Sequence, residues 1–201
     1  EERFVWYSIM SVINHVDKIL IWDTGSDDST LEIISKIKYQ KSKIDFRRFG
    51  KITKEEFPVL RQKMLDETKS DWVLLLDGDE IWQDISIKNL RTEIEKTNAD
   101  CIVVPTFMLL GDVFHYQEEK GGDYRIAGKV GHYNLRAFSA KIPGLHVEIH
   151  PNKQGFMREG FFGKDNKLIY ENGPSTMKVL NTPYLHASHL HWLGPGTPGS
   201  R

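Results

Sequence analysis

The sequence predicts an α/β fold in which a mixed, mostly parallel sheet is flanked by helices. Three observations support this prediction. Helix-like and strand-like segments alternate through the first half of the chain, as they do where helices connect parallel strands. The expected strands are apolar on both faces, which is typical of strands buried between two layers of helices. Two of these strands end in groups of Asp, at the edge where open α/β sheets bind their ligands.

The first half of the chain supplies most of the regular elements. Apolar residues recur every three or four positions, the spacing of one helix face, in four segments. These expected helices cover residues 5–13, 31–37, 54–69 and 87–94. Short apolar runs between them predict strands at residues 18–22, 44–49, 71–76 and 101–105. After Pro105 the periodicity fades, and we expect a mixed sheet with long loops and strands at residues 133–138 and 145–149.

Length and composition indicate one soluble domain. The 201 residues include 27 Lys and Arg against 28 Asp and Glu, so no basic field favours nucleic acid as a partner. No run approaches the roughly 20 apolar residues that span a bilayer, and the opening Glu1-Glu2-Arg3 lacks the pattern of a leader peptide. The single Cys101 excludes an internal disulfide. We therefore expect a cytoplasmic protein, peripheral at a membrane, without a transmembrane segment.

The two halves of the chain differ chemically. Residues 1–100 carry 16 basic and 20 acidic side chains, whereas seven of the 8 histidines fall between His115 and His191. An acidic half and a His-rich half are expected if the two face each other across a metal or phosphate site. Chance clustering is the alternative.

A tight group of carboxylates follows the apolar run at residues 71–76. Asp77, Asp79 and Glu80 lie within four positions, with Gly78 between the first two. Charges of one sign at this spacing repel one another, and Mg²⁺ or Mn²⁺ held by one or two carboxylates relieves the repulsion. The segment therefore predicts a site for a divalent cation and a diphosphate. The alternative is a solvated acidic turn that caps the next helix.

A second polar segment, Asp23-Thr-Gly-Ser-Asp-Asp28, follows the strand expected at residues 18–22. If this strand neighbours the one at residues 71–76 in a parallel sheet, Asp23 lies beside Asp77. Asp23 is then placed to accept hydrogen bonds from a base or ribose. The rest of the segment reads as a turn around Gly25 that leads into the next helix.

Both motifs, in this order and spacing, resemble those of family 2 glycosyltransferases with the GT-A fold, over about residues 1 to 150. The resemblance implies a nucleotide-diphosphate sugar as donor, such as a UDP- or GDP-sugar, a divalent cation and an inverting mechanism. Motif for motif, it implies that Asp23 contacts the base, Asp77 the ribose or metal, and Asp79 the metal. In the family's pattern, GT-A enzymes open with a strand that would precede Glu1, so we expect this chain to lack its first strand.

The second half of the chain offers candidates for the remaining roles. Asn134-Leu-Arg136-Ala-Phe138 followed by Gly144-Leu-His-Val-Glu148 resembles the family pattern near the acceptor. An inverting transfer needs a carboxylate that takes the proton of the acceptor hydroxyl, and Glu148 is the first candidate, with Asp112 the second. Arg136 is expected to bind the diphosphate through its planar fork, unless it forms a structural salt bridge.

The segment His186-Ala-Ser-His189-Leu-His191 resembles the C-terminal histidine segment that in GT-A enzymes can supply a further metal ligand. On a strand, His189 and His191 share a face, so we expect one or both to bind the metal. An imidazole in a carboxylate site suits Mn²⁺ better than Mg²⁺. The alternative is that these histidines are packed or hydrogen-bonded in the structure.

The combined prediction is one glycosyltransferase domain at residues 1–192, with a donor half at 1–105, an acceptor half at 106–192 and a flexible tail at 193–201. The expected reaction is a hexosyl-type transfer to a hydroxyl of a saccharide or lipid-linked acceptor, in the synthesis of a cell-envelope polysaccharide. A nucleotidyltransferase of the same fold, or an inactive module that binds nucleotide sugars, is the alternative.

Overall fold

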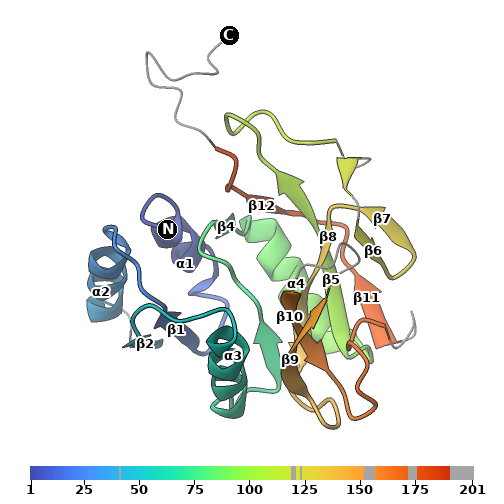
Figure 1. The fold of residues 1–201 in the computed structure, drawn as a ribbon. Coiled ribbons are helices and arrows are strands. Elements are labelled where there is room, and N and C mark those ends of the chain that lie inside the picture. The colour runs from blue at the N-terminus through green and yellow to red at the C-terminus, as the bar shows by residue number, and fades with distance from the viewer. Residues whose placement is uncertain (41, 119–120, 123, 152–156, 172–175, 191–201) are drawn as a thin grey trace.

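The computed structural model describes residues 1–40, 42–118, 121–122, 124–151, 157–171 and 176–190, which form a mixed α/β fold (Figure 1). The helices are α1 (Val5–Val12), α2 (Thr30–Gln40), α3 (Glu56–Asp66) and α4 (Asp84–Lys96). The strands are β1 (Ile19–Asp23), β2 (Ile44–Arg48), β3 (Trp72–Leu74), β4 (Glu80–Ile81), β5 (Cys101–Met108), β6 (Tyr124–Ile126), β7 (Lys129–Gly131), β8 (Tyr133–Ser139), β9 (His146–Pro151), β10 (Met157–Phe162), β11 (Met177–Val179) and β12 (Tyr184–His186).

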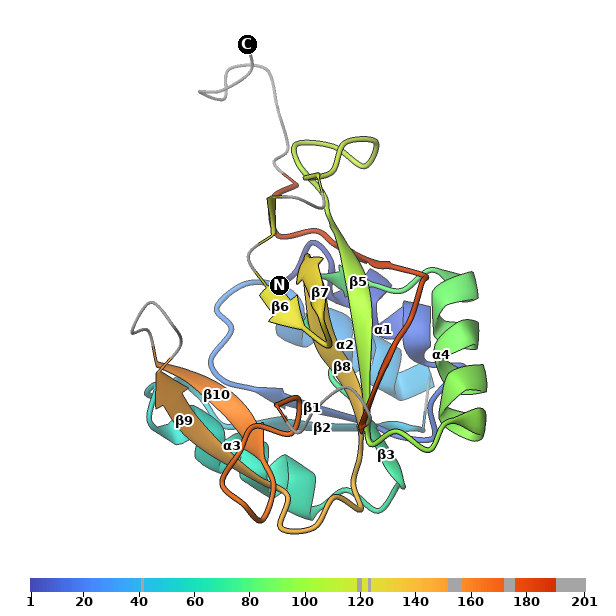
Figure 2. The ribbon, with the colours of Figure 1, turned by 90° about the vertical axis from the view of Figure 1, so that its right-hand side faces the viewer.

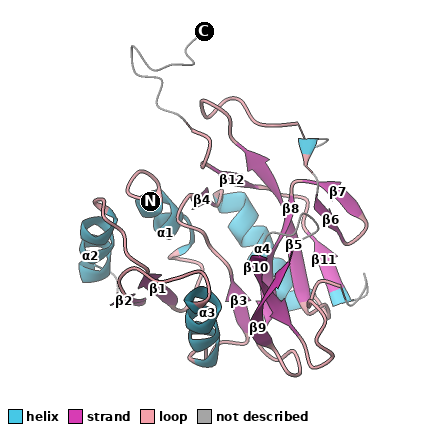
Figure 3. Ribbon diagram, in the orientation of Figure 1, coloured by secondary structure: helices cyan, strands magenta, loops and turns pink. Residues whose placement is uncertain are grey.

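The α-helices α1 to α4 precede the strands β5 to β12 in the sequence, and Figure 3 distinguishes helices from strands by colour. This distribution confirms the predicted α/β class, and every segment predicted to be helix or strand contains that element. None of the helices in the described ranges is both long and apolar enough to cross a bilayer. The tail predicted at residues 193–201, like His191, lies outside the described residues.

The main sheet has six strands in the order β3-β8-β5-β12-β4, with β11 paired to β5 beside this path. Strand β5 runs parallel to β11 and β12 but antiparallel to β8, which is also antiparallel to β3. The main sheet is thus more antiparallel than the sequence predicted. Parallel neighbours need a long crossover, usually a helix, and none of the described residues beyond α4 forms an α-helix.

Strands β1 and β2 form a separate parallel pair joined by α2. Their apolar side chains pack with α1 and α2 into one cluster that includes Ile9, Ile13, Ile34 and Ile44. The pair lies beside α3 at one end of the molecule (Figure 1). Because β1 and β3 share no ladder among the described residues, the adjacency predicted for Asp23 and Asp77 does not arise from strand pairing.

The main sheet is covered on both faces (Figure 2). On one face, Ile87 and Leu90 of α4 pack against Ile102 and Val104 of β5. On the other face, Cys101 of β5 and Phe138 of β8 pack against Val147 and Phe161 of the β9–β10 hairpin. Residues that alternate along β5 therefore serve opposite layers, as the pleat of a strand requires.

The β9–β10 hairpin is fixed to α3 by polar contacts. The Arg61 guanidinium pairs with the Glu159 carboxylate, at 3.1 Å from Nη2 to Oε1 and 3.2 Å from Nε to Oε2. The next residue of α3 makes the second contact, in which the backbone N–H of Val147 donates to Gln62 Oε1 at 2.7 Å. These bonds align the hairpin that carries Glu148 with the helix.

Burial of Cys101 predicts that its thiol does not react in the folded protein. The side chain is fully buried, and burial raises the pKa of Cys101 from 9.0 to about 12. Since the thiolate is the reactive form, labelling by a disulfide reagent at pH 8 is expected to be about a thousandfold slower than in urea-unfolded protein. Native labelling at the unfolded rate would contradict the placement of β5 in the core.

Candidate active site

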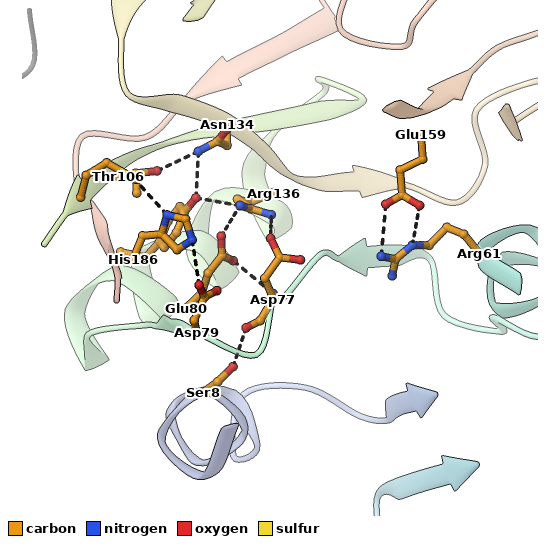
Figure 4. Close-up of polar contacts among 12 residues, drawn as sticks. Ser8, Arg61, Asp77, Asp79, Glu80, Thr106, Asn134, Arg136, Glu159 and His186 are labelled. Atoms are coloured by element: carbon orange, nitrogen blue, oxygen red, sulfur yellow. Dashed lines mark hydrogen bonds and ion pairs between the residues drawn. The ribbon is translucent and has the colours of Figure 1, made fainter. Parts of the chain in front are cut away.

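The acidic segment forms a tight turn at the carboxyl end of β3. The backbone N–H of Glu80 donates to the carbonyl of Asp77 at 3.1 Å. The same carbonyl accepts a hydrogen bond from Ser8 Oγ of α1 at 2.9 Å. Chain reversal at this point sends Glu80 into β4, so Asp77, Asp79 and Glu80 project from one short turn at the edge of the main sheet (Figure 4).

The Arg136 guanidinium of β8 neutralises two carboxylates of this turn. Its Nη1 lies 3.2 Å from Asp77 Oδ2, its Nη2 contacts Glu80 Oε1, and its Nε donates to the Tyr184 hydroxyl at 2.9 Å. The Glu80 side chain is fully buried, whereas Asp77 is 54% exposed. Burial raises the pKa of Glu80 to about 7, although the charge of Arg136 opposes this shift.

Strand β12 brings His186 to the same turn. It lies between β5 and β4, with His186 opposite Glu80 in the ladder. His186 Nε2 is 3.2 Å from Asp79 Oδ2, and its Nδ1 is 3.0 Å from Met108 Sδ. The hydrogen bond to Asp79 raises the pKa of His186 despite its partial burial. Burial disfavours the Asp79 anion, yet the hydrogen bond and charge of His186 outweigh it and lower the pKa of Asp79.

Asp23 organises the loop that follows β1. The carboxylate is buried and accepts the backbone N–H groups of Gly25 and Ser26, each at 3.1 Å. Gly25 has φ of 110°, and a Cβ there would lie 2.7 Å from the Lys51 side chain, so only glycine fits this position. The conformation of the loop is therefore fixed by these hydrogen bonds and by Gly25. The predicted contact of Asp23 with a base would use the lone pairs that remain on its carboxylate oxygens.

Three other predicted residues, Glu148, Asp112 and His189, make their contacts away from the acidic turn. Glu148 is half exposed and lies 3.5 Å from His146 Nε2. Asp112 accepts the backbone N–H groups of Phe114 and His115, and the His115 imidazole lies 2.8 Å away. The hydrogen bond from His115 contributes most to a lowered pKa of Asp112. His189 lies in an exposed turn after β12, where its carbonyl accepts the N–H of Gly111.

The donor atoms at the turn are suited to a divalent cation, but they do not form a closed cage. Within the described part of the chain, no three His, Cys, Asp or Glu side chains are gathered as a metal-binding group. Asp79 and His186 already face each other, whereas Asp77 is directed to Arg136. Carboxylate oxygen and imidazole nitrogen are ligands that Mn²⁺ accepts. The geometry therefore offers two convergent donors and a third that a cation would draw from Arg136.

The sequence comparison with protein families supplies the observation that decides the chain's classification. Residues 1–159 match the family model described as "Glycosyl transferase family 2". The chain belongs to this family. The matched region includes the Asp23 loop, the acidic turn and Arg136.

Relatives and solved structures agree with membership of family 2. The SPbeta prophage-derived glycosyltransferase SunS of Bacillus subtilis (strain 168) is 24% identical over 108 residues, which cover 52% of this chain and 24% of SunS. Glycosyltransferase SunS of Bacillus phage SPbeta matches equally. The crystal structure of S. aureus TarS 1-349 superposes with a TM-score of 0.60 at 13% identity, covering 92% of this chain and 57% of TarS. This chain spans about a quarter of the length of its curated relatives, and the likeness to TarS shows a shared GT-A fold.

Two residues that the structure places next to the acidic turn, His186 and Tyr184, were not assigned a role from the sequence. His189 and His191 were favoured over His186 because they would share a face of a strand, but β12 ends at His186. Tyr184, which contacts Arg136, was not singled out at all. The available signal was the short β-prone Tyr184-Leu-His186 after Pro183, which places His186 last in a strand rather than in the turn that follows.

Removing the counter-ion of Glu80 is expected to destabilise the protein strongly. In Arg136→Met a buried carboxylate loses its partner, a change that costs about 3–5 kcal/mol. The measurement is the free energy of unfolding in urea. Arg61→Met is the matched control, because it breaks a partly exposed pair with Glu159 worth about 1 kcal/mol or less. Equal losses in the two variants would contradict the special role of the buried pair.

Proposed function

We propose that this protein transfers a hexosyl group from a nucleotide-diphosphate sugar to a hydroxyl of a saccharide or lipid-linked acceptor, with inversion at the anomeric carbon. The observation that carries the proposal is the pairing of Asp79 with His186 beside Asp77, in the turn that follows β3 in a family 2 chain. Open α/β sheets bind their ligands at the carboxyl ends of their strands.

Asp79, His186 and Asp77 are the residues that would hold Mn²⁺ or Mg²⁺. The 3.2 Å between Asp79 Oδ2 and His186 Nε2 is close to the separation of about 3 Å between adjacent ligands of an octahedral cation with bonds of 2.0–2.1 Å. A bound cation supplies charge that stabilises the departing diphosphate. His186 takes the place that the sequence had assigned to His189 or His191.

The donor nucleotide would lie between the Asp23 loop that follows β1 and the acidic turn that follows β3. Asp23 accepts hydrogen bonds from the base, and the half-exposed carboxylate of Asp77 faces the ribose or the metal. Arg136 is occupied by Asp77, Glu80 and Tyr184, so its proposed contact with the diphosphate would require release of Asp77. A UDP- or GDP-sugar fits these roles.

The acceptor hydroxyl attacks the anomeric carbon while a carboxylate takes its proton and the nucleoside diphosphate leaves. Glu148 is the better base, because Asp112 already accepts three hydrogen bonds and has a lowered pKa. A weakly basic carboxylate is a poor proton acceptor. A component of a cell-envelope polysaccharide, met by the enzyme at the cytoplasmic face of the membrane, is the proposed setting.

The alternative is a module that binds a nucleotide sugar without turnover. It is favoured by one observation, namely that within the described ranges Glu148 pairs with His146, and Asp112 with Phe114 and His115, rather than with the acidic turn. Binding is common to both functions, so release of free nucleoside diphosphate from a donor distinguishes them.

Metal-dependent donor binding is the first test of the proposal. UDP-, GDP- and other nucleotide sugars are screened by thermal shift with and without Mn²⁺, and their hydrolysis is followed. At least one is expected to raise the melting temperature only with Mn²⁺. Asp79→Asn and His186→Ala are expected to lose this effect, because each removes one metal donor, whereas His189→Ala retains it.

Two outcomes of this screen would contradict parts of the proposal. If no nucleotide or nucleotide sugar stabilises the parent protein with Mn²⁺, donor binding is excluded. If Asp79→Asn responds like the parent protein, the metal role of Asp79 is excluded while donor binding stands.

Replacing the base is expected to affect turnover rather than binding. Glu148→Gln keeps the size of the side chain but removes its basicity, so kcat is expected to fall at least about a hundredfold with little change in the donor thermal shift. Asp112→Asn is the control and is expected to change kcat less than about fivefold. A larger effect at Asp112 than at Glu148 would reverse the assignment.

A further inference from the structure

Tyr184 lies behind the acidic turn, fully buried and outside any predicted binding role. Its ring stacks on Trp82, with centroids 5.3 Å apart and planes inclined by 16°. Its hydroxyl accepts two hydrogen bonds, from Arg136 Nε at 2.9 Å and from Asn134 Nδ2 at 2.9 Å. Asn134 Nδ2 also donates to Thr106 Oγ1 at 3.0 Å. The hydroxyl is therefore held in place from β5 and β8.

The hydroxyl of Tyr184 is one of three acceptors that hold the Arg136 guanidinium. Each of its three nitrogens faces a different acceptor: Nε faces Tyr184, Nη1 faces Asp77 and Nη2 faces Glu80. Because the guanidinium is planar and rigid, an acceptor that fixes Nε also fixes the directions of both Nη groups. The Arg136 carbon Cζ lies over the Tyr184 ring, 5.1 Å from its centroid, so the ring limits movement out of the plane.

We propose that Tyr184 is a positioning residue for donor and metal binding, acting through Arg136 to set where the Asp77 carboxylate stands. The inference rests on the proposed function, because it assigns Asp77 to the donor and metal site. It adds a residue that touches neither ligand.

Asp77 is freer to move than Glu80 when Arg136 turns, because Asp77 is the more exposed of the two carboxylates. Glu80 is fully buried and is held in β4 by its ladder with β12. Asp77 is 54% exposed, lies in the turn and shares Arg136 through a longer contact. Without the Tyr184 hydroxyl, Arg136 Nε lacks an acceptor in a buried place and the guanidinium turns to find another. When Nη1 moves, the side chain that moves with it is therefore Asp77 rather than Glu80.

The test compares Tyr184→Phe with Ser86→Ala. Tyr184→Phe retains the ring and its stacking on Trp82 but removes the hydroxyl. Ser86 Oγ donates to the carbonyl of Pro183 at 2.6 Å, so Ser86→Ala loosens the chain next to Tyr184 without touching Arg136. The probe is UDP or GDP, whichever the parent protein binds, titrated in the presence of Mn²⁺.

Tyr184→Phe is expected to raise the Kd of the nucleotide about tenfold, as for the loss of one hydrogen bond to a charged group. Ser86→Ala is expected to change it less than about twofold. In an Arg136→Lys background, Tyr184→Phe should have no further effect, since the residue through which it acts is already altered. An unchanged Kd in Tyr184→Phe, an equal loss in Ser86→Ala, or additive losses in the double variant would overturn the proposal.

A ligand-free readout separates this proposal from the proposed function. Hydrogen exchange of the backbone amides at residues 75–81 is expected to be faster in Tyr184→Phe than in Ser86→Ala, even if the parent protein binds no nucleotide. Equal exchange in the two variants would overturn the positioning role by itself. If Tyr184→Phe does not fold, Asn134→Ala removes the second donor to the same hydroxyl, and its exchange is expected to change in the same direction.

Discussion

The ion pair between the buried Glu80 carboxylate and Arg136 is the constraint on which the rest of the site depends. A charge without a partner in this position would cost several kcal/mol, so β8 must deliver a cation to the start of β4 whatever else the fold does. Meeting that demand fixes the spacing between β8 and the acidic turn. It also places Asp77 against the same guanidinium, because the turn spans only four residues.

The remaining carboxylates of the turn are neutralised in a way that leaves them available. Asp77 shares Arg136, and Asp79 is matched by His186. Both partners are side chains, so these two contacts can rearrange without any break in the backbone ladders. Arg136 and His186 therefore reduce the repulsion among the carboxylates of the acidic turn when no ligand is bound. Glu80 is completely buried, and its pair with Arg136 has a structural role.

The alternation of helix and strand, and the acidic turn at the end of β3, could be predicted from the sequence because they depend on local periodicity and on residue types a few positions apart. The pairing of strands could not, because it depends on contacts between distant segments such as β8 and β3. For the same reason the sequence left open whether Arg136 binds a diphosphate or forms a structural salt bridge, and it is the fold that pairs Arg136 with Glu80. The choice among the three histidines depended on where β12 ends, and strand ends are set by tertiary contacts.

The place of β12 has a consequence for how the protein comes to be assembled during synthesis. This strand supplies His186 and Tyr184, and it pairs with β4, whose residues precede it by more than a hundred positions. Contacts of such separation form late, because the intervening chain must first be ordered. On a ribosome, the acidic turn emerges early and waits for both of its cations. Arg136 arrives first and His186 only after it, so the acidic turn of a nascent chain lacks one of its partners until β12 has been synthesised.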